Sequence, residues 1–222
     1  MTIAFVQQTA VTQAGSSATV QRTLTGVAAG SMLTVTTSDR GGAVAPSGIS
    51  DDVNGAWNLA LGASNTTGFH SGIYMFPSSA AGTVVITVTY AIAGILLMGA
   101  QEWSHTGTVE MEDSSTNQQT AATTHSHGTV SSAGAGLIIT NSIAESTLTE
   151  TVAAGFTALN DDGFRQWSQR QIVTGATSTD GAFTTSAAGN TYCVAVVYRE
   201  VAAGGNANLF AGKFGAPFVG KL

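Results

Sequence analysis

The strongest constraint on the fold is the alternation between residues 83 and 90. Its even positions carry apolar side chains, and its odd positions are mostly threonine. Because successive side chains of a β-strand point to opposite faces of a sheet, this pattern predicts a strand with one apolar face and one hydroxyl-bearing face. We expect this strand to belong to a continuous antiparallel meander that covers residues 48–104.

The meander is expected to begin with a hairpin in residues 48–61. Asn54 and Gly55 predict a type I′ turn at its tip, since both central positions of that turn need a positive φ. Residues 69–76, which contain a glycine and are followed by a proline, are predicted to form the next strand.

The end of the meander, residues 95–104, is more fully apolar, as in a strand buried on both faces. Gly94 is expected to mark a turn between this strand and the alternating one. The apolar window of residues 83–100 is therefore predicted to be two strands and not a segment that crosses a membrane.

Further short strands are expected on both sides of the meander, and no segment has a sustained helical period. A polar interruption is expected at residues 105–117. Ten or more short strands with Gly, Asn, Asp and Ser turns predict an all-β fold, a sandwich or a barrel. The additional strands are predicted at residues 2–8, 17–25, 31–37, 118–130, 136–141, 156–159, 164–173, 182–186 and 192–200.

Charge is scarce and unevenly placed in this chain. Only 9% of residues are charged, against about 25% in a typical globular domain. Residues 1–200 hold all thirteen acidic residues and five of the seven basic ones, a net charge of −8. An acidic body argues against binding to nucleic acid. The one cysteine, Cys193, lies in an apolar segment and is predicted to be a buried small hydrophobe, so no disulfide within the chain is expected.

Residues 201–222 differ from the rest and are interpreted as a docking tail. They hold no acid, both lysines of the chain, and a pair of glycines that would act as a hinge. Disordered tails are usually poor in aromatic residues, so three phenylalanines on a cationic strip favour anchoring to a partner; a frayed terminus is the alternative. The predicted docking residues are Phe210, Lys213, Phe214, Phe218 and Lys221.

Four segments of the meander, at residues 49–57, 72–76, 83–90 and 101–104, together resemble a known module. It is the jelly-roll, concanavalin-like β-sandwich of tailed-phage virion proteins and large bacterial surface proteins. Those modules carry an Asp-x-x-Gly-Asn-x-Trp-like hairpin, an aromatic strand before a Gly-Thr-Thr-Val-Thr-Val strand, and a Glu-Tyr-Ser-Gly-like end. This chain departs from them by reading Asn-Gly in the hairpin and by having Trp103 where tyrosine is common.

The resemblance implies an antiparallel, jelly-roll β-sandwich for residues 1–200. It also implies a structural virion protein, made in the host cytoplasm without an export signal, with capsid decoration or cement as the expected role. Other virion proteins are the expected partners, and a homo-oligomer, a trimer by preference, is the expected assembly. A carbohydrate-binding adhesin or tail-fibre module that recognises host glycans is the alternative. No cofactor and no membrane partner are predicted.

Aromatic and imidazole side chains are the candidates for ligand binding. Trp57, Trp103 and Trp167 would be a glycan platform if they were exposed, and packing in the sandwich core is the competing interpretation. His125 and His127 are two residues apart, so on a strand they would project from one face and could hold a metal with a third ligand. The sequence names no third ligand, so a polar strand face is the preferred interpretation.

Acidic residues are the remaining candidates, and none predicts an enzyme. Glu110, Glu112 and Asp113 only faintly resemble the strand-borne carboxylates of jelly-roll glucanases, because their surroundings do not match the hydrophobic strand of that motif. The Asp-rich turns at residues 51–55 and 161–163 could contact calcium through oxygen ligands. Each is more simply a turn built on aspartate and asparagine side chains.

Overall fold

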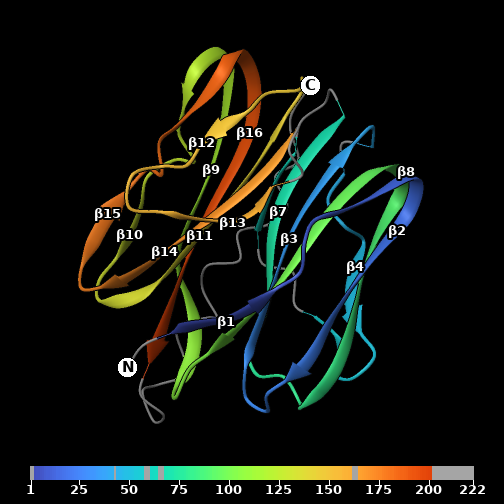
Figure 1. The fold of residues 1–222 in the computed structure, drawn as a ribbon, viewed down its shortest axis with the longest axis vertical. Helices are drawn as coiled ribbons and strands as arrows, with labels where there is room; N and C mark the ends of the chain where they lie inside the picture. The colour runs from blue at the N-terminus through green and yellow to red at the C-terminus, as the bar shows by residue number, and fades with distance from the viewer. Residues whose placement is uncertain (1–2, 43, 58–60, 65–67, 162–164, 202–222) are drawn as a thin grey trace, which may run out of the picture.

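The computed structural model describes residues 3–42, 44–57, 61–64, 68–161 and 165–201. Within these ranges every regular element is a β-strand and every pairing is antiparallel, so the predicted all-β sandwich class is confirmed (Figure 1). The strands are β1 (Ala4–Gln8), β2 (Thr12–Val27), β3 (Met32–Arg40), β4 (Gly48–Asp51), β5 (Gly55–Ala56), β6 (Leu61–Ser64), β7 (Phe69–Phe76), β8 (Gly82–Ser104), β9 (Thr108–His125), β10 (Val130–Ser132), β11 (Ala135–Ala144), β12 (Glu150–Thr151), β13 (Thr157–Asp161), β14 (Gln166–Thr174), β15 (Thr177–Thr179) and β16 (Phe183–Val201).

An eight-stranded sheet forms the N-terminal half of the molecule. Its order is β5-β4-β8-β3-β7-β6, and β1 and β2 also pair with β8. β8 therefore bonds to four strands that precede it in the chain. The alternation that predicted a strand at residues 83–90 is present, because Val84, Ile86, Val88 and Tyr90 all lie in the apolar core enclosed by this sheet.

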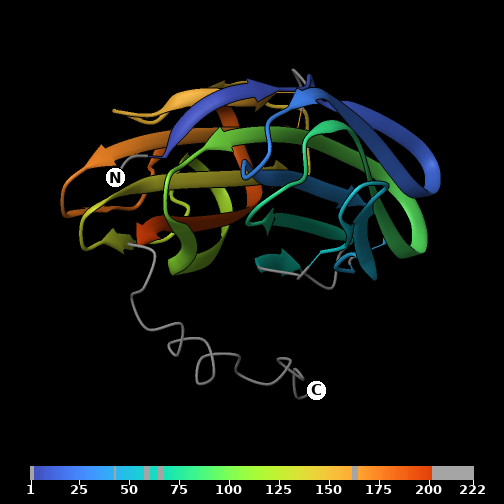
Figure 2. The ribbon, with the colours of Figure 1, turned by 90° about the horizontal axis from the view of Figure 1, so that it is seen from below.

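The predicted turn at Gly94 is wrong, because β8 runs through it as a single 23-residue strand. β2 pairs with both halves of β8, and its register shifts on either side of Ser17, which faces Gly94. The extra residues of β8 at this corner bulge outward, and Ile92 is 52% exposed. Figure 2 shows β2 and β8 curving together around this end of the molecule. Continuous pairing with β2 thus carries the backbone through a bend that the sequence marks as a break.

A six-stranded sheet forms the C-terminal half, in the order β12-β16-β11-β14-β13, with β9 paired to β16. The expected polar interruption at residues 105–117 is wrong, since β9 begins at Thr108. β9 pairs only with β16 among the described strands, and most of its side chains are at least partly exposed. An edge strand of this kind gains its stability from backbone hydrogen bonds, so it needs no apolar alternation. The predicted edge at residues 182–186 is instead the first part of the 19-residue strand β16.

Two large apolar cores are arranged around the eight-stranded sheet. The first lies inside the curl of this sheet and includes Leu33, Val35, Leu96 and Met98. The second lies between the two sheets. It joins Met32, Ile73 and Trp103 of the N-terminal half to residues of β11 and β16. Tyr192, Val194, Val196 and Tyr198 of β16 share one face, as their period-2 spacing predicts.

A buried amide connects the two sheets beside this second core. Asn141 of β11 donates from Nδ2 to the Thr37 carbonyl of β3 and to Ser71 Oγ of β7, both at 3.0 Å. Gln166 Nε2 donates to Asn141 Oδ1 at 3.1 Å. All four side chains are buried. The join between the sheets therefore depends on hydrogen bonds as well as on apolar packing.

We predict that Asn141→Ala lowers the free energy of unfolding by about 2–4 kcal/mol, because it leaves buried partners on β3, β7 and β14 without their hydrogen bonds. Urea denaturation followed by circular dichroism measures the change. Asn117→Ala is the matched control: its half-buried side chain donates only to the Ser126 carbonyl, at 2.9 Å, so we expect a loss of about 1 kcal/mol. Equal losses in the two variants would contradict a special role for Asn141.

Candidate functional site

The hairpin at residues 48–57 forms as predicted, but its turn has a different geometry. Asp51 pairs with Gly55, so the loop has three residues and not two. Gly55 has φ +83°, whereas Asn54 is not among the residues with positive φ. The predicted type I′ turn is therefore wrong. The arrangement is a loop of residues 52–54 that is followed directly by a left-handed glycine.

The carboxylate of Asp51 explains this turn. It accepts hydrogen bonds from the backbone N–H groups of Val53 (2.8 Å) and Asn54 (2.5 Å). It also accepts from Trp57 Nε1 at 2.6 Å. The Asn54 side-chain amide donates to the same carboxylate and to Ser79 Oγ. Both oxygens of Asp51 are occupied by N–H donors, so the structure supports the predicted aspartate turn over a calcium site.

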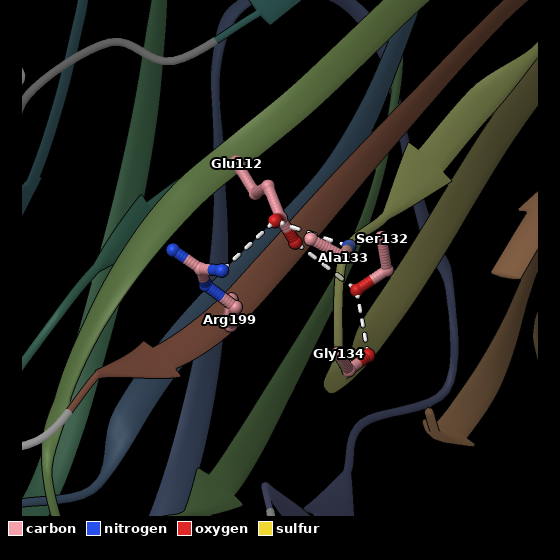
Figure 3. Close-up of polar contacts among 5 residues, drawn as sticks. All are labelled: Glu112, Ser132, Ala133, Gly134 and Arg199. Atoms are coloured by element: carbon pink, nitrogen blue, oxygen red, sulfur yellow. Dashed lines mark hydrogen bonds and ion pairs between the residues drawn. The ribbon is translucent and has the colours of Figure 1, made fainter. Parts of the chain in front are cut away.

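The acidic segment on β9 is used for contacts within the protein (Figure 3). Glu112 forms an ion pair with Arg199 of β16, with Oε1 3.2 Å from the guanidinium. Its carboxylate also accepts from Ser132 Oγ at 3.0 Å and from the Ala133 backbone N–H at 3.1 Å. The same hydroxyl lies 2.9 Å from the Gly134 carbonyl, so its one hydrogen is shared between the two acceptors. Glu112 therefore joins β9 to β16 and to the turn after β10.

The neighbouring acids have related positions. Asp113 accepts from the Ser131 backbone N–H at 2.8 Å, a second link between β9 and β10. Glu110 pairs in register with Arg199. The register with β16 shifts between Glu110 and Asp113, so strict alternation does not hold across these acids. The carboxylates of Glu112 and Asp113 therefore hold β9 of the six-stranded sheet to β10 and the turn after it.

The three tryptophans are all in the protein interior. Trp57, Trp103 and Trp167 are 5%, 0% and 3% exposed. Trp57 binds Asp51, and Trp103 donates from Nε1 to Thr34 Oγ1 at 2.8 Å between the sheets. Stacking on a sugar needs an exposed ring face, so these side chains do not form the glycan platform considered from the sequence.

His125 and His127 are both buried and both contact the Phe183 ring. His125 ends β9, whereas His127 lies beyond it in the connection to β10, so they do not share a strand face. Both nitrogens of His125 and Nδ1 of His127 are hydrogen-bonded within the protein. Among the described residues no group of three or more His, Cys, Asp or Glu side chains could hold a metal ion.

The predicted docking tail lies outside the described residues. This applies to all five of its candidate contacts, which are Phe210, Lys213, Phe214, Phe218 and Lys221. The described part of the chain contains no helix that could span a membrane.

Two buried carboxylates were not singled out from the sequence. Glu102 accepts from Ser31 Oγ (2.7 Å), from the Ala28 N–H (2.9 Å) and from Gln7 Nε2 (2.5 Å), so it ties β1 and the β2–β3 turn to β8. Asp39 at the end of β3 is fully buried, and burial raises its pKa to about 6. A charged residue within an apolar strand is the signal that could have identified Glu102.

His70 is a third buried ionisable group that sequence reasoning missed. Its Nε2 lies 2.9 Å from the Tyr74 hydroxyl on the same face of β7. Gly72 stands between them, and a Cβ there would lie 2.6 Å from that hydroxyl oxygen. The missing side chain of Gly72 thus lets His70 and Tyr74 meet, and burial lowers the pKa of His70 to about 4.

Comparison with protein-family models, with curated proteins and with solved structures gives no match for this chain. The resemblance of residues 49–104 to a phage sandwich module therefore stays an expectation.

Asp51→Asn tests whether the carboxylate holds the hairpin. The change places an N–H donor against the Trp57 or backbone donors, so we predict a loss of about 1–3 kcal/mol in the free energy of unfolding. Urea denaturation with tryptophan fluorescence is the measurement. Asp52→Asn is the control, because exposed Asp52 only accepts from the Val85 N–H and the amide oxygen can replace that contact. Equal stability of both variants would refute the role of Asp51.

Proposed function

We propose that this chain is a structural protein of a tailed-phage virion, with capsid decoration or cement as its role. The β-sandwich would be the body on the particle, and residues 209–222 would attach it or link its copies. The main observation that supports this proposal is that acidic side chains of the body join strands to one another. Asp51 closes the hairpin, Glu102 ties three segments together, and Glu112 links β9, β16 and the turn after β10.

This use of carboxylates supports a scaffold over a catalyst. A catalytic acid or base must reach a substrate, and it is usually placed in a cleft with its oxygens available. The oxygens of Asp51 and Glu102 are instead filled by donors from the protein itself. Asp51 belongs to the stretch that carries the resemblance to phage modules, so the most recognisable motif of that stretch has a structural use.

The charge distribution supports attachment through the C-terminal segment. The body carries a net charge of −8, and the segment beyond residue 200 carries two lysines and three phenylalanines. Apolar anchors in pockets with cations around them are a common way to fasten one protein to another. The glycan-binding alternative would need a platform other than the three buried tryptophans.

Light scattering of the full chain beside a chain that ends at Ala202 tests the role of the tail. We predict that the full chain is an oligomer, with three times 22.4 kDa as the expected mass, and that truncation reduces it to a monomer. Circular dichroism of both proteins checks that the body stays folded.

Two sets of substitutions in the full chain separate apolar anchoring from charge. Replacing Phe210, Phe214 and Phe218 by serine should reproduce the truncation, because the anchors are lost. Replacing Lys213 and Lys221 by glutamine is the control and should weaken the assembly less, mainly at low salt. Oligomers of equal mass with and without the tail would contradict its role in assembly.

A further inference from the structure

Two buried histidines lie together on the outer face of the six-stranded sheet. The imidazole of His125 stacks on the Phe183 ring at 5.2 Å between centroids, and that of His127 contacts the same ring at 4.8 Å. Both side chains are at most 1% exposed. Since a charged imidazole needs hydration or an acceptor for each N–H, the partners of the four ring nitrogens decide whether this cluster can take up a proton.

The hydrogen bonds around His125 fix its proton. The Thr185 hydroxyl donates to the Ala187 carbonyl at 2.9 Å, so Thr185 Oγ1 accepts from His125 Nε2 at 3.0 Å. Nδ1 is then the acceptor, and it receives the Thr191 hydroxyl at 2.8 Å. Thr191 Oγ1 in turn accepts the Cys193 thiol at 3.6 Å. A second proton on His125 would face the hydrogen of Thr191 and would reverse this chain of donors.

His127 has one free nitrogen in the part of the chain that the structure describes. Its Nδ1 donates to the Gly181 carbonyl at 2.9 Å, and its Nε2 is buried without a hydrogen-bond partner. A proton on Nε2 would be a buried N–H with no acceptor. Gly181 lies between this ring and Thr140, since a Cβ placed on Gly181 would lie 3.1 Å from His127 Nδ1 and 3.5 Å from Thr140 Cγ2.

His127 belongs to a two-stranded layer that covers the six-stranded sheet, and its ring contact with Phe183 of β16 joins this layer to the sheet. The backbone N–H of His127 donates to the Asp180 carbonyl at 2.9 Å, which joins the turn before β10 to the turn after β15. β10 and β15 pair with each other, and Val130 of β10 packs on Ile138 and Val197 of the six-stranded sheet. Displacing the His127 imidazole from Phe183 would therefore disturb the attachment of this two-stranded layer, and displacing His125 would remove the second ring that packs on Phe183.

We propose that His125 and His127 form an acid-sensitive latch. When both imidazoles are neutral they pack on Phe183 and hold the covering layer, residues 126–132 and 177–182, on the six-stranded sheet; when either gains a proton the layer opens. This inference does not depend on the virion role proposed above.

The direction of the pH effect follows from the groups around the two rings. Burial lowers the pKa of His127 to about 4, while the Gly181 carbonyl and the Asp180 carboxylate raise it and His125 lowers it. Burial also lowers the pKa of His125, against a smaller raising effect of the Ala122 backbone. An opened imidazole regains its ordinary pKa near 6.5, so the open form binds protons more readily and opening is favoured as pH falls from 6.5 towards 4.

Glu150 of β12 acts in the opposite direction. Burial, and secondarily Asp161, raise its pKa to about 8, so its protonated form favours the closed state as pH falls. Cys193, whose pKa burial raises to about 12, stays a thiol throughout this range. The wild type and a variant at His127 both carry Glu150 and Cys193, so a comparison of the two cancels the effect of these groups on the pH dependence of opening.

The test is native-state hydrogen exchange of the wild type and of His127→Asn between pH 8 and pH 5. Asparagine can keep the donor to the Gly181 carbonyl but does not titrate. Opening constants are obtained for residues 126–132 and 177–182 after correction for intrinsic exchange. Between these pH values we expect the ratio of the wild-type constant to the variant constant to rise about 30-fold, from pKa values of 6.5 open and about 4 closed.

His105→Asn is the matched control. His105 lies in the β8–β9 turn and contacts the Pro77 and Gly107 carbonyls, so this variant should show the wild-type pH response in the covering layer. A ratio of wild type to His127→Asn that stays constant from pH 8 to pH 5 would overturn the proposal.

A titration of the unaltered protein guards against a variant that fails to fold. Nuclear magnetic resonance follows the imidazole Cε1–H signals of His125 and His127 in the folded wild type. Both rings should stay neutral well below pH 6.5 in the closed state. A titration midpoint near 6.5 for either ring, with the covering layer still closed, would show that the closed state accepts the proton and would refute the proposed latch.

Discussion

The two halves of the molecule are held in one alignment by a few buried hydrogen bonds. Asn141 of β11 can reach the Thr37 carbonyl and Ser71 Oγ only if β3, β7 and β11 cross at one place. Apolar side chains alone would let two curled sheets slide at little cost, whereas a buried amide without partners costs more than the bond is worth when made. The polar groups between the sheets therefore specify the alignment, and the apolar residues around Trp103 and Leu137 supply most of the burial.

β8 is the second organising element, because four strands depend on it. Its even-numbered side chains fill the inner core from both sides of the corner near Gly94, and Trp103, on its other face, packs between the sheets. Glu102 adds a polar anchor on the same strand, since its carboxylate gathers donors from the segments before β3. In both sheets the buried ionisable groups thus connect segments that are far apart in sequence.

The fold class and several strands were predictable because apolar residues at every second position mark the buried face of a strand. Residues 69–76 form β7 with those bounds, and the face of β16 shared by Tyr192, Val194, Val196 and Tyr198 followed from its spacing. The failures occurred where pairing overrides the local signal. Gly94 marks a break, yet β2 bonds across it, and β9 looks like a loop, yet β16 pairs along it. Asn54-Gly55 suggested a two-residue turn, but the Asp51 carboxylate accepts the backbone N–H groups of Val53 and Asn54 and fixes a longer loop. The partners of His125 and His127 come from β16 and its preceding turn, more than fifty residues away, so no local pattern could reveal them.

The position of β8 in the chain has a consequence for synthesis on the ribosome. Its partners β1, β2, β3 and β4 are all made before it, and the register joins residues as distant as Ala4 and Ser104. Contacts of such long sequence separation form slowly, because the entropy of loop closure is lost before they give any stabilisation. β2 has no strand to bond to until residues 82–98 have emerged, and β1 has none until residues 101–104 have emerged, while the β3–β7 pair can already form. The N-terminal sheet is therefore completed by its latest central strand, and the nascent chain must keep about a hundred residues unaggregated until then.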